Sequence, residues 1–375
     1  MSGGAAGWWW WNRGSLTTGG SGTGVRSPWA AGERRCGGLV VVGTGDRPPW
    51  VVVDPGVDLD RRGCWQTGSV AGRVIAVVGP TAAGKSGLSV RLAQAVGGEV
   101  VNADSMQLYR GMDIGTAKLS DDQRHGVPHH LLDVWDVRGS ANVAEFQSLA
   151  QVAIGAIRAR GRVPVLVGGS GLYVRAVIDD LDFPGTDPRL RERLEAELAE
   201  RGPAALHARL AALDPAAAAA ILPGNGRRIV RALEVIELSG RPFAATLPRY
   251  DARCPSVQLG LRIPGPELDR RIAERVDRMW QAGFVDEVRS LERAGLRDGR
   301  TASRALGYAQ VLRFLAGEWP EEQARQETVR ATRKFARRQE SWFRRDPRVT
   351  WLDAERENGG DLLAQAMTTI RASDP

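Results

Sequence analysis

A short segment of the sequence has the composition of a loop that binds phosphate groups. It contains two glycines separated by four residues, then a lysine and a hydroxyl side chain: Gly79-Pro80-Thr81-Ala82-Ala83-Gly84-Lys85-Ser86. In such a P-loop the backbone N–H groups turn toward the phosphates, the lysine neutralises them and the hydroxyl can bind Mg²⁺. A chance glycine-rich turn would match the same letters, but this segment follows an apolar run and opens a helical pattern. It therefore predicts a site for a diphosphate or a nucleotide such as ATP, with Mg²⁺ as cofactor.

Two further polar side chains stand where open α/β sheets place reacting groups. Asp104 follows the apolar pair Val100–Val101, and Ser170 lies in the glycine-rich turn after Val163–Val167. Ligands bind at the carboxyl ends of parallel strands, so Asp104 could accept a proton from an attacking nucleophile and Ser170 could hydrogen-bond the same group. The alternatives, a helix N-cap for Asp104 and a simple loop hydroxyl for Ser170, stay open.

The elements that must hold these residues alternate in the order strand, helix, strand, helix, strand. Short β-branched runs are typical of buried parallel strands, and the longer periodic segments are typical of helices. Strands are expected at Val74–Val78, around Val100–Val101, at Val163–Val167 and at Gln258–Ile263, and helices at 85–95 and 143–160. This order predicts an α/β fold with a parallel-sheet core of the P-loop nucleoside-triphosphate-hydrolase type.

An interruption of that pattern predicts the domain organisation. Residues 187–250 are rich in alanine, arginine and leucine with helical spacing, which predicts an inserted helical domain. The core then comprises 73–186 and 251–375, and it ends in basic helices.

The basic character of the C-terminal helices predicts a polyanionic partner. Residues 325–348 hold nine arginines and lysines against three acidic residues, and the whole chain has a net charge of +7. Arg330, Arg333, Lys334 and Arg337 share one helical face. Such a stripe is the electrostatic footprint of a nucleic-acid backbone, although a solvated charged face has the same pattern.

Several other classes of protein do not fit. Three cysteines and four histidines without ligand spacing argue against a zinc site or a disulfide framework, and His129-His130 fit a structural role better than metal binding. No apolar run is long enough to cross a bilayer, and no secretory signal layout is present. These features predict a cytoplasmic protein without membrane contact, and we expect a monomer.

Short blocks along the chain resemble the bacterial tRNA dimethylallyltransferase family. After the P-loop the blocks are Asp104–Tyr109, Gly111–Lys118, Pro128–Asp133, Gly168–Tyr173, Arg227–Val235, Arg304–Tyr308 and Arg337–Trp342. Each block alone is modestly specific, whereas all of them in family order are very specific. The resemblance covers about residues 73 to 353 and leaves the first 72 residues unexplained.

The resemblance implies a reaction and roles for the residues already singled out. A dimethylallyl group would pass from dimethylallyl diphosphate to the exocyclic N6 amine of adenosine 37, 3′-adjacent to the anticodon, in tRNAs that read codons beginning with U. The P-loop would hold the donor diphosphate rather than ATP, Asp104 would be the general base and Ser170 would assist it. The family usually has threonine in place of Ser86 or Ser170, and serine keeps the hydroxyl.

The resemblance also implies which residues contact the tRNA anticodon loop, with Arg191 credited with tRNA or diphosphate contact. Together with two arginines of the basic stripe, they are Asp104, Ser105, Met106, Gln107, Ser170, Arg191, Arg227, Arg228, Ile229, Val230, Arg231, Arg304, Gly307, Tyr308, Arg333 and Arg337.

Three other functions fit parts of the pattern. In a P-loop small-molecule kinase Asp104 would take a proton from a substrate hydroxyl, but no clear lid sequence is present and the basic helix would be idle. An adenylate prenyltransferase acting on free nucleotides would need neither the helical insertion nor the basic surface. A non-catalytic RNA-binding module would need neither the P-loop nor Asp104.

Residues 1–72 differ in composition from the rest of the chain. They hold seven of the twelve tryptophans, including Trp8–Trp11, and show no sustained strand or helix period. This composition predicts a disordered extension or sequence translated from upstream of the true start. The opposing interpretation is an arm that stacks on RNA bases.

We predict that a chain beginning at Val70 matches the full-length chain in stability and in tRNA affinity, because the first recognisable strand begins only at Val74. Stacked tryptophans would each contribute ~1–3 kcal/mol. A filter-binding titration that shows more than about a tenfold loss of affinity, ~1.4 kcal/mol, would instead identify an RNA-binding arm.

Overall fold

Six parallel strands form the sheet that holds the site. The structure is a computed structural model that describes residues 72–181, 183–243, 250–355 and 359–373, so the predicted 1–72 extension lies almost wholly outside the described residues. The sheet order is β3-β2-β4-β1-β5-β6. The strands are β1 (Val74–Val78), β2 (Gly98–Asn102), β3 (His129–His130), β4 (Val163–Gly168), β5 (Ser256–Arg262) and β6 (Val349–Asp353). The predicted α/β parallel-sheet fold is confirmed.

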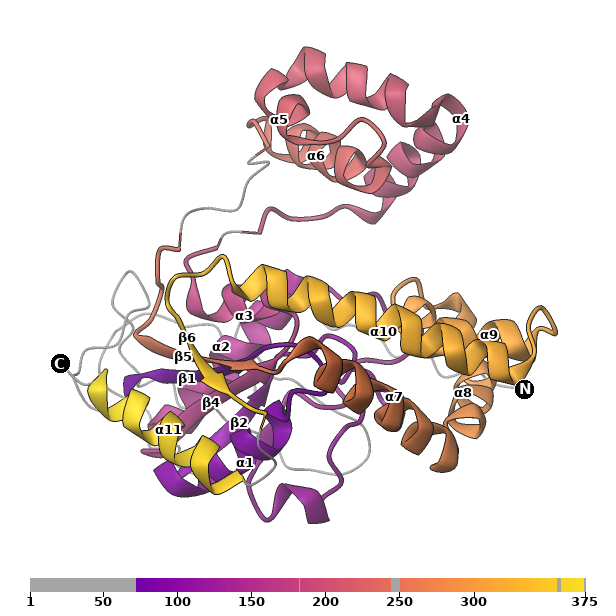
Figure 1. Ribbon diagram of the computed structural model, residues 1–375. Helices are drawn as coiled ribbons and strands as arrows, with labels where there is room; N and C mark the ends of the chain where they lie inside the picture. Colours follow the sequence, from indigo (N-terminus) through magenta and orange to yellow (C-terminus); the bar gives the residue numbers. More distant parts are fainter. Residues whose placement is uncertain (1–71, 182, 244–249, 356–358, 374–375) are drawn as a thin grey trace, which may run out of the picture. The chain divides into compact units, whose positions relative to one another are not determined.

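Both faces of the sheet are covered by helices, which explains why the strands read as continuous apolar runs. Ile75 and Val77 of β1 point into one core with helices α1 (Lys85–Val96) and α11 (Gly359–Ala372). Val74, Ala76 and Val78 point into the other core with α2 (Val143–Ala159) and α3 (Gly171–Ile178). Figure 1 shows these helices around the central strands.

A second group of helices packs beside the sheet around an aromatic cluster. It consists of α7 (Gly265–Gln281), α8 (Phe284–Arg293), α9 (Tyr308–Leu315) and α10 (Glu321–Phe343), with short 3₁₀ turns at Leu296–Asp298 and Ala302–Arg304 between α8 and α9. A further 3₁₀ turn lies at Asp122–Arg124. The rings of Phe284 and Tyr308 meet edge to face, 5.0 Å between centroids and 89° between planes. Both side chains are fully buried, so this cluster fixes how α8 and α9 meet.

Three helices occupy the segment predicted as an insertion, and they have a core of their own. They are α4 (Pro188–Leu213), α5 (Pro215–Ala220) and α6 (Gly226–Ser239). Asp187 accepts hydrogen bonds from the N–H groups of Arg189 and Leu190, 2.8 and 3.0 Å, and so caps α4 at its proline-led first turn. Buried side chains of α4 and α6, among them Leu194 and Leu233, pack against each other.

The sequence pattern missed two edge strands. β3 is only two residues long and consists of His129-His130. The Nε2 atom of His130 lies 2.7 Å from a carboxylate oxygen of Glu99 in β2. β6 was expected within a helical stretch, but pairing with β5 makes it the edge of the sheet. Within the described ranges no helix is long and apolar enough to cross a membrane.

The strands β2 and β4 approach so closely at their carboxyl ends that only glycine fits there. The N–H of Ala103 donates to the carbonyl oxygen of Val167, 2.7 Å, and a Cβ on Gly168 would lie 2.5 Å from the Ala103 oxygen. This contact brings the turns after β2 and β4 together.

We therefore predict that Gly168→Ala lowers the free energy of unfolding by about 1–3 kcal/mol, because backbone atoms must shift. Gly155→Ala is the matched control: its Cβ meets nothing within 4 Å on α2, and it should stabilise the chain by up to ~1 kcal/mol. Urea titrations of both variants measure the difference. Equal effects would show that the close approach carries no cost.

Candidate active site

The P-loop curls tightly between β1 and α1. Gly79 and Gly84 have positive φ angles of 136° and 88°. A Cβ on Gly79 would lie 2.9 Å from the carbonyl oxygen of Leu261 in β5, so glycine is required where the loop leaves the sheet. α1 begins at Lys85, and its first N–H groups and positive dipole end are available to an anion.

Lys85 is the cation of this loop. Its Nζ atom donates to the carbonyl oxygen of Pro80, 2.6 Å, and so folds back over the loop. Burial lowers the pKa of Lys85 to about 7, Asp104 opposes this shift and Arg275 adds to it. The next residue, Ser86, is partly exposed, and its hydroxyl has no hydrogen-bond partner among the described residues.

Asp104 is held by Asn102 and Met106, and one of its carboxylate oxygens makes no hydrogen bond to a described residue. Its N–H donates to the side-chain oxygen of Asn102, 2.9 Å, and its Oδ1 accepts from the N–H of Met106, 2.9 Å. Residues 105–108 form turns and no helix follows Asp104, so its side chain stabilises a turn and does not cap a helix. Its Oδ2 has no hydrogen-bond partner in the described part of the chain, and this oxygen can accept a proton.

Ser170 is brought to the same place by the pairing of β2 with β4. It precedes α3, and its hydroxyl does not cap that helix. Instead the Ser170 Oγ lies 3.4 Å from both the N–H nitrogen and the Oγ of Ser105. The structure therefore brings together the P-loop, Asp104 with its neighbours up to Gln107, and Ser170.

Arg275 is a candidate site residue that the sequence interpretation missed. It is partly buried on α7, close enough to Lys85 and Asp104 to influence their charges, and burial lowers its own pKa against the effect of Asp104. Its Nη2 atom donates to the carbonyl oxygen of Thr116, 3.1 Å, which also accepts from the side chain of Gln107, 3.2 Å. The sequence did contain a signal for this residue. Arg275 falls on the same helical face as the apolar residues Leu268, Ile272 and Met279, where an arginine is unexpected unless it has a buried partner.

A carboxylate on α8 fixes the loop that carries Thr116. Glu287 accepts from the N–H groups of Asp113, Ile114 and Gly115, at 3.1, 2.6 and 3.2 Å. It also accepts from the hydroxyl of Tyr308, 2.6 Å. Burial raises the pKa of Tyr308 well above its usual value, so this hydroxyl stays a donor.

The residues predicted to contact tRNA around α9 therefore differ in exposure. Tyr308 is buried, and Gly307 precedes α9 with a φ of 85° against the ring of Phe284. Arg304 is exposed on its 3₁₀ turn. Through its hydrogen bond to Glu287, Tyr308 supports the loop that carries Thr116. Contact of this segment with tRNA stays a prediction.

Two predicted arginines of the insertion surround a buried carboxylate. Glu234 of α6 is fully buried, and it accepts from Arg191, from Arg231 at 2.8 Å and from Thr186 at 2.5 Å. Burial would raise the pKa of Glu234, but these donors outweigh it and lower the pKa to about 2. In the same block Ile229 and Val230 are buried in the helical core, whereas Arg227 and Arg228 are exposed.

The basic stripe on α10 is divided into paired and unpaired cations. Arg337 lies 2.7 Å from a carboxylate oxygen of Asp269, and Arg333 donates to the carbonyl oxygen of the same residue, 3.1 Å. Lys334 and Arg338 are exposed and have no ion pair with any described residue. Within the predicted stripe Arg330, Arg333 and Arg337 thus have acidic partners, and Lys334 and its neighbour Arg338 carry the unpaired charge. Contact of Arg333 and Arg337 with tRNA stays a prediction.

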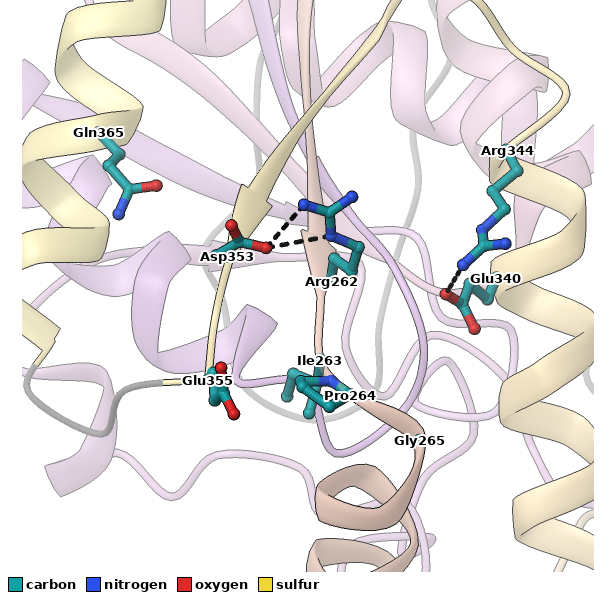
Figure 2. Close-up of a pocket in the computed structure, with 9 residues that line it drawn as sticks. All are labelled: Arg262, Ile263, Pro264, Gly265, Glu340, Arg344, Asp353, Glu355 and Gln365. Carbon is teal, nitrogen blue, oxygen red and sulfur yellow. Dashed lines mark hydrogen bonds and ion pairs between the residues drawn. The ribbon is translucent and has the colours of Figure 1, made fainter.

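A pocket of about 570 Å³ opens near the carboxyl ends of β5 and β6. Figure 2 shows that its two arginines face acidic partners: Arg262 lies 2.9 Å from Asp353, and Arg344 lies 2.7 Å from Glu340. None of the predicted site residues lines this pocket, and both of its arginines already have acidic partners. Among the described residues no group of three or more histidine, cysteine or acidic side chains could hold a metal.

Comparisons with known proteins place the chain among transferases that modify tRNA. Residues 107–346 match the family model described as IPP transferase. The tRNA dimethylallyltransferase of Thermobifida fusca is 72% identical over 302 residues, which cover 79% of this chain and 94% of the relative. That of Streptomyces coelicolor is 71% identical over 80% of this chain and 96% of its own length.

Two solved structures have the same architecture. The tRNA isopentenylpyrophosphate transferase of Bacillus halodurans has a TM-score of 0.59 at 41% identity, covering 80% of this chain and 97% of that one. A eukaryotic dimethylallyltransferase acting on tRNA has a TM-score of 0.70 at 26% identity, covering 81% of this chain and 80% of its own.

The lowered pKa of Lys85 predicts a proton linkage. Above pH 7 much of the free lysine is neutral, and a bound diphosphate favours its charged form, so binding should take up a proton. At pH 8, inorganic diphosphate should carry up to about one more proton into the parent protein than into Lys85→Arg, whose guanidinium is always charged. Titration calorimetry in two buffers of different ionisation enthalpy measures this. Equal uptake by both proteins would contradict the assignment.

Proposed function

Because this chain belongs to the IPP transferase family of tRNA dimethylallyltransferases, we propose that it moves a dimethylallyl group from dimethylallyl diphosphate to the N6 amine of adenosine 37 in tRNA. The acceptors in this proposal are tRNAs that read codons beginning with U, and diphosphate is released. One observation carries the proposal. The Lys85 cation of the P-loop and the unpaired oxygen of Asp104 both follow the carboxyl ends of parallel strands in the same sheet. A leaving anion and a nucleophile's proton can thus be received at the same site.

The leaving group demands positive charge. As the allylic C–O bond breaks, its electron pair leaves with the diphosphate, which becomes more negative. Lys85, Arg275 and the N–H groups at the start of α1 are the donors in place to stabilise that charge. This role extends the predicted diphosphate-binding set, Gly79–Ser86, by one arginine from α7.

A magnesium ion fits the same loop. The hydroxyl of Ser86 makes no hydrogen bond to a described residue and is therefore available as a ligand. Mg²⁺ commonly takes one or two protein ligands and completes its shell with phosphate oxygens and water, which agrees with a described site that has no cage of acidic side chains. When bound, the ion would neutralise charge on the diphosphate.

The nucleophile needs a base. The exocyclic amine of adenine is a weak nucleophile, and as its nitrogen bonds to the allylic carbon it must lose a proton. The free Oδ2 of Asp104 accepts that proton, and Ser170, held 3.4 Å from Ser105, orients the amine beside it. The target base must leave its stack to reach these groups.

The tRNA would be held by exposed cations on separate elements. Arg227 and Arg228 on α6, Arg304 before α9, and Lys334 and Arg338 on α10 are exposed, so they can contact the phosphate backbone. The helical insertion would serve as a tRNA-binding domain, with Arg191 and Arg231 keeping it in shape through Glu234. We further propose that the protein acts as a monomer in the cytoplasm, where tRNA is modified.

The kinase and adenylate-prenyltransferase alternatives lose support because the relatives are tRNA dimethylallyltransferases over most of their length. Transfer of radiolabelled dimethylallyl groups to tRNA in ATP-free buffer is the direct test of the proposal. If the activity strictly required ATP, the result would favour the kinase alternative instead.

We predict that Asp104→Asn lowers kcat by roughly 10² to 10⁴, the usual contribution of a general base. The amide keeps the Met106 hydrogen bond that Asp104 Oδ1 accepts, so the fold should be unchanged, and binding of inorganic diphosphate should change little. Asp122→Asn, an exposed aspartate on a 3₁₀ turn, is the charge control. If Asp104→Asn transfers at the parent rate per folded molecule, the residue is only a turn-former.

A further inference from the structure

Helix α10 connects the two cores that lie on opposite faces of the sheet. Ala336 packs into the core around α1 and α11, whereas Phe343 packs into the core around α2 and α3. Gln339 stands between them on the same helical face, and its side chain is only 6% exposed. A glutamine in the middle of an apolar stripe costs stability unless its amide is fully hydrogen-bonded.

The amide of Gln339 joins the two turns of the candidate site. Its Oε1 accepts from the N–H of Thr81 in the P-loop, 2.8 Å, and its Nε2 donates to the carbonyl oxygen of Gly169, 3.0 Å. The fit is close, since a Cβ on Gly169 would lie 2.1 Å from Nε2. One turn of helix further along, the indole of Trp342 occupies the space where a Cβ on Gly171 would lie.

We propose that Gln339 is a positioning residue that fixes the P-loop relative to the turn carrying Ser170. The inference rests on the proposed function and adds to it a contact from α10 that acts without touching substrate. Through Thr81 the amide holds the loop for the diphosphate, and through Gly169 it holds the turn beside Asp104. It thereby sets the separation between the leaving group and the accepting base.

The chemistry of the side chain matches this task. One turn offers an N–H and the other a carbonyl oxygen, so the connecting group must accept at one end and donate at the other. A primary amide does both in a single plane. Methionine has a similar length but makes neither bond, and an ionised glutamate could accept from Thr81 but would repel the Gly169 oxygen.

The test compares Gln339→Met and Gln339→Glu with Gln323→Met, an exposed glutamine on the same helix. We expect Gln339→Met to lower kcat by about 10²-fold, the scale for misplacing reacting groups by about 1 Å. We also expect its Kd for inorganic diphosphate to rise by roughly tenfold, one lost hydrogen bond in an anion site. Gln323→Met should behave like the parent in both measurements.

Gln339→Glu supplies a readout that a purely structural role would not give. The new carboxyl group can donate to the Gly169 oxygen only when protonated, and burial raises its pKa. The ratio of variant to parent kcat/KM should therefore rise as pH falls. A flat ratio, or Gln339→Met with parental kcat and parental diphosphate affinity, would overturn the proposal.

Diphosphate titrations without tRNA separate this inference from the proposed function. If the parent protein transfers no dimethylallyl group but Gln339→Met still weakens diphosphate binding while Gln323→Met does not, the positioning role stands and the proposed function fails. If the parent protein transfers the group but Gln339→Met and Gln323→Met bind diphosphate equally well, the proposed function stands and the positioning role of Gln339 fails.

Discussion

The P-loop, Asp104 and Ser170 all depend on one constraint, the convergence of parallel strands at a single carboxyl edge. β1 leads into the P-loop, β2 into Asp104 and β4 into Ser170, and these three strands are neighbours. A parallel sheet of this kind needs both faces buried, which α1, α2, α3 and α11 provide. Glycine at Gly79 and Gly168 then allows the backbones to approach closely where side chains would clash.

The electrostatics of the site suit a ligand that brings its own negative charge. Lys85 and Arg275 are two cations partly withdrawn from water, with Asp104 as the acidic group that influences both. Burial destabilises the charged forms of both side chains, and the charge of Arg275 further lowers the pKa of Lys85. In the proposed function a bound diphosphate would reverse that balance by stabilising the charged forms of both side chains.

Two carboxylates outside the site, half-buried Glu287 and buried Glu234, each hold a surrounding loop by accepting several hydrogen bonds. Glu287 accepts three successive N–H groups of the loop that ends at Thr116, and through that carbonyl it supports Arg275 and Gln107. Glu234 likewise gathers Arg191 and Arg231 at the base of the insertion. In both places several donors satisfy the carboxylate oxygens and offset the cost of withdrawing the charge from water.

The sequence alone determined whatever depends on local spacing. The continuous β-branched runs identified the central strands, and the glycine, lysine and serine pattern identified the P-loop between Val78 and α1. Asp104 and Ser170 could be placed because they directly follow such runs. The two edge strands were missed, since β3 is too short to show a period and β6 becomes a strand through its pairing with β5.

Only the tertiary structure decided which polar side chains face the site and which face each other. Arg275 and Gln339 come from helices far along the chain. Their roles can be recognised only when the backbone groups that they bind, distant in sequence, are known. Conversely, Arg191, Arg231, Arg333 and Arg337 have basic side chains that the sequence cannot distinguish from free cations. Only the tertiary structure identifies their carboxylate partners, Glu234 and Asp269, because an ion pair depends on distance in space and not on distance along the chain.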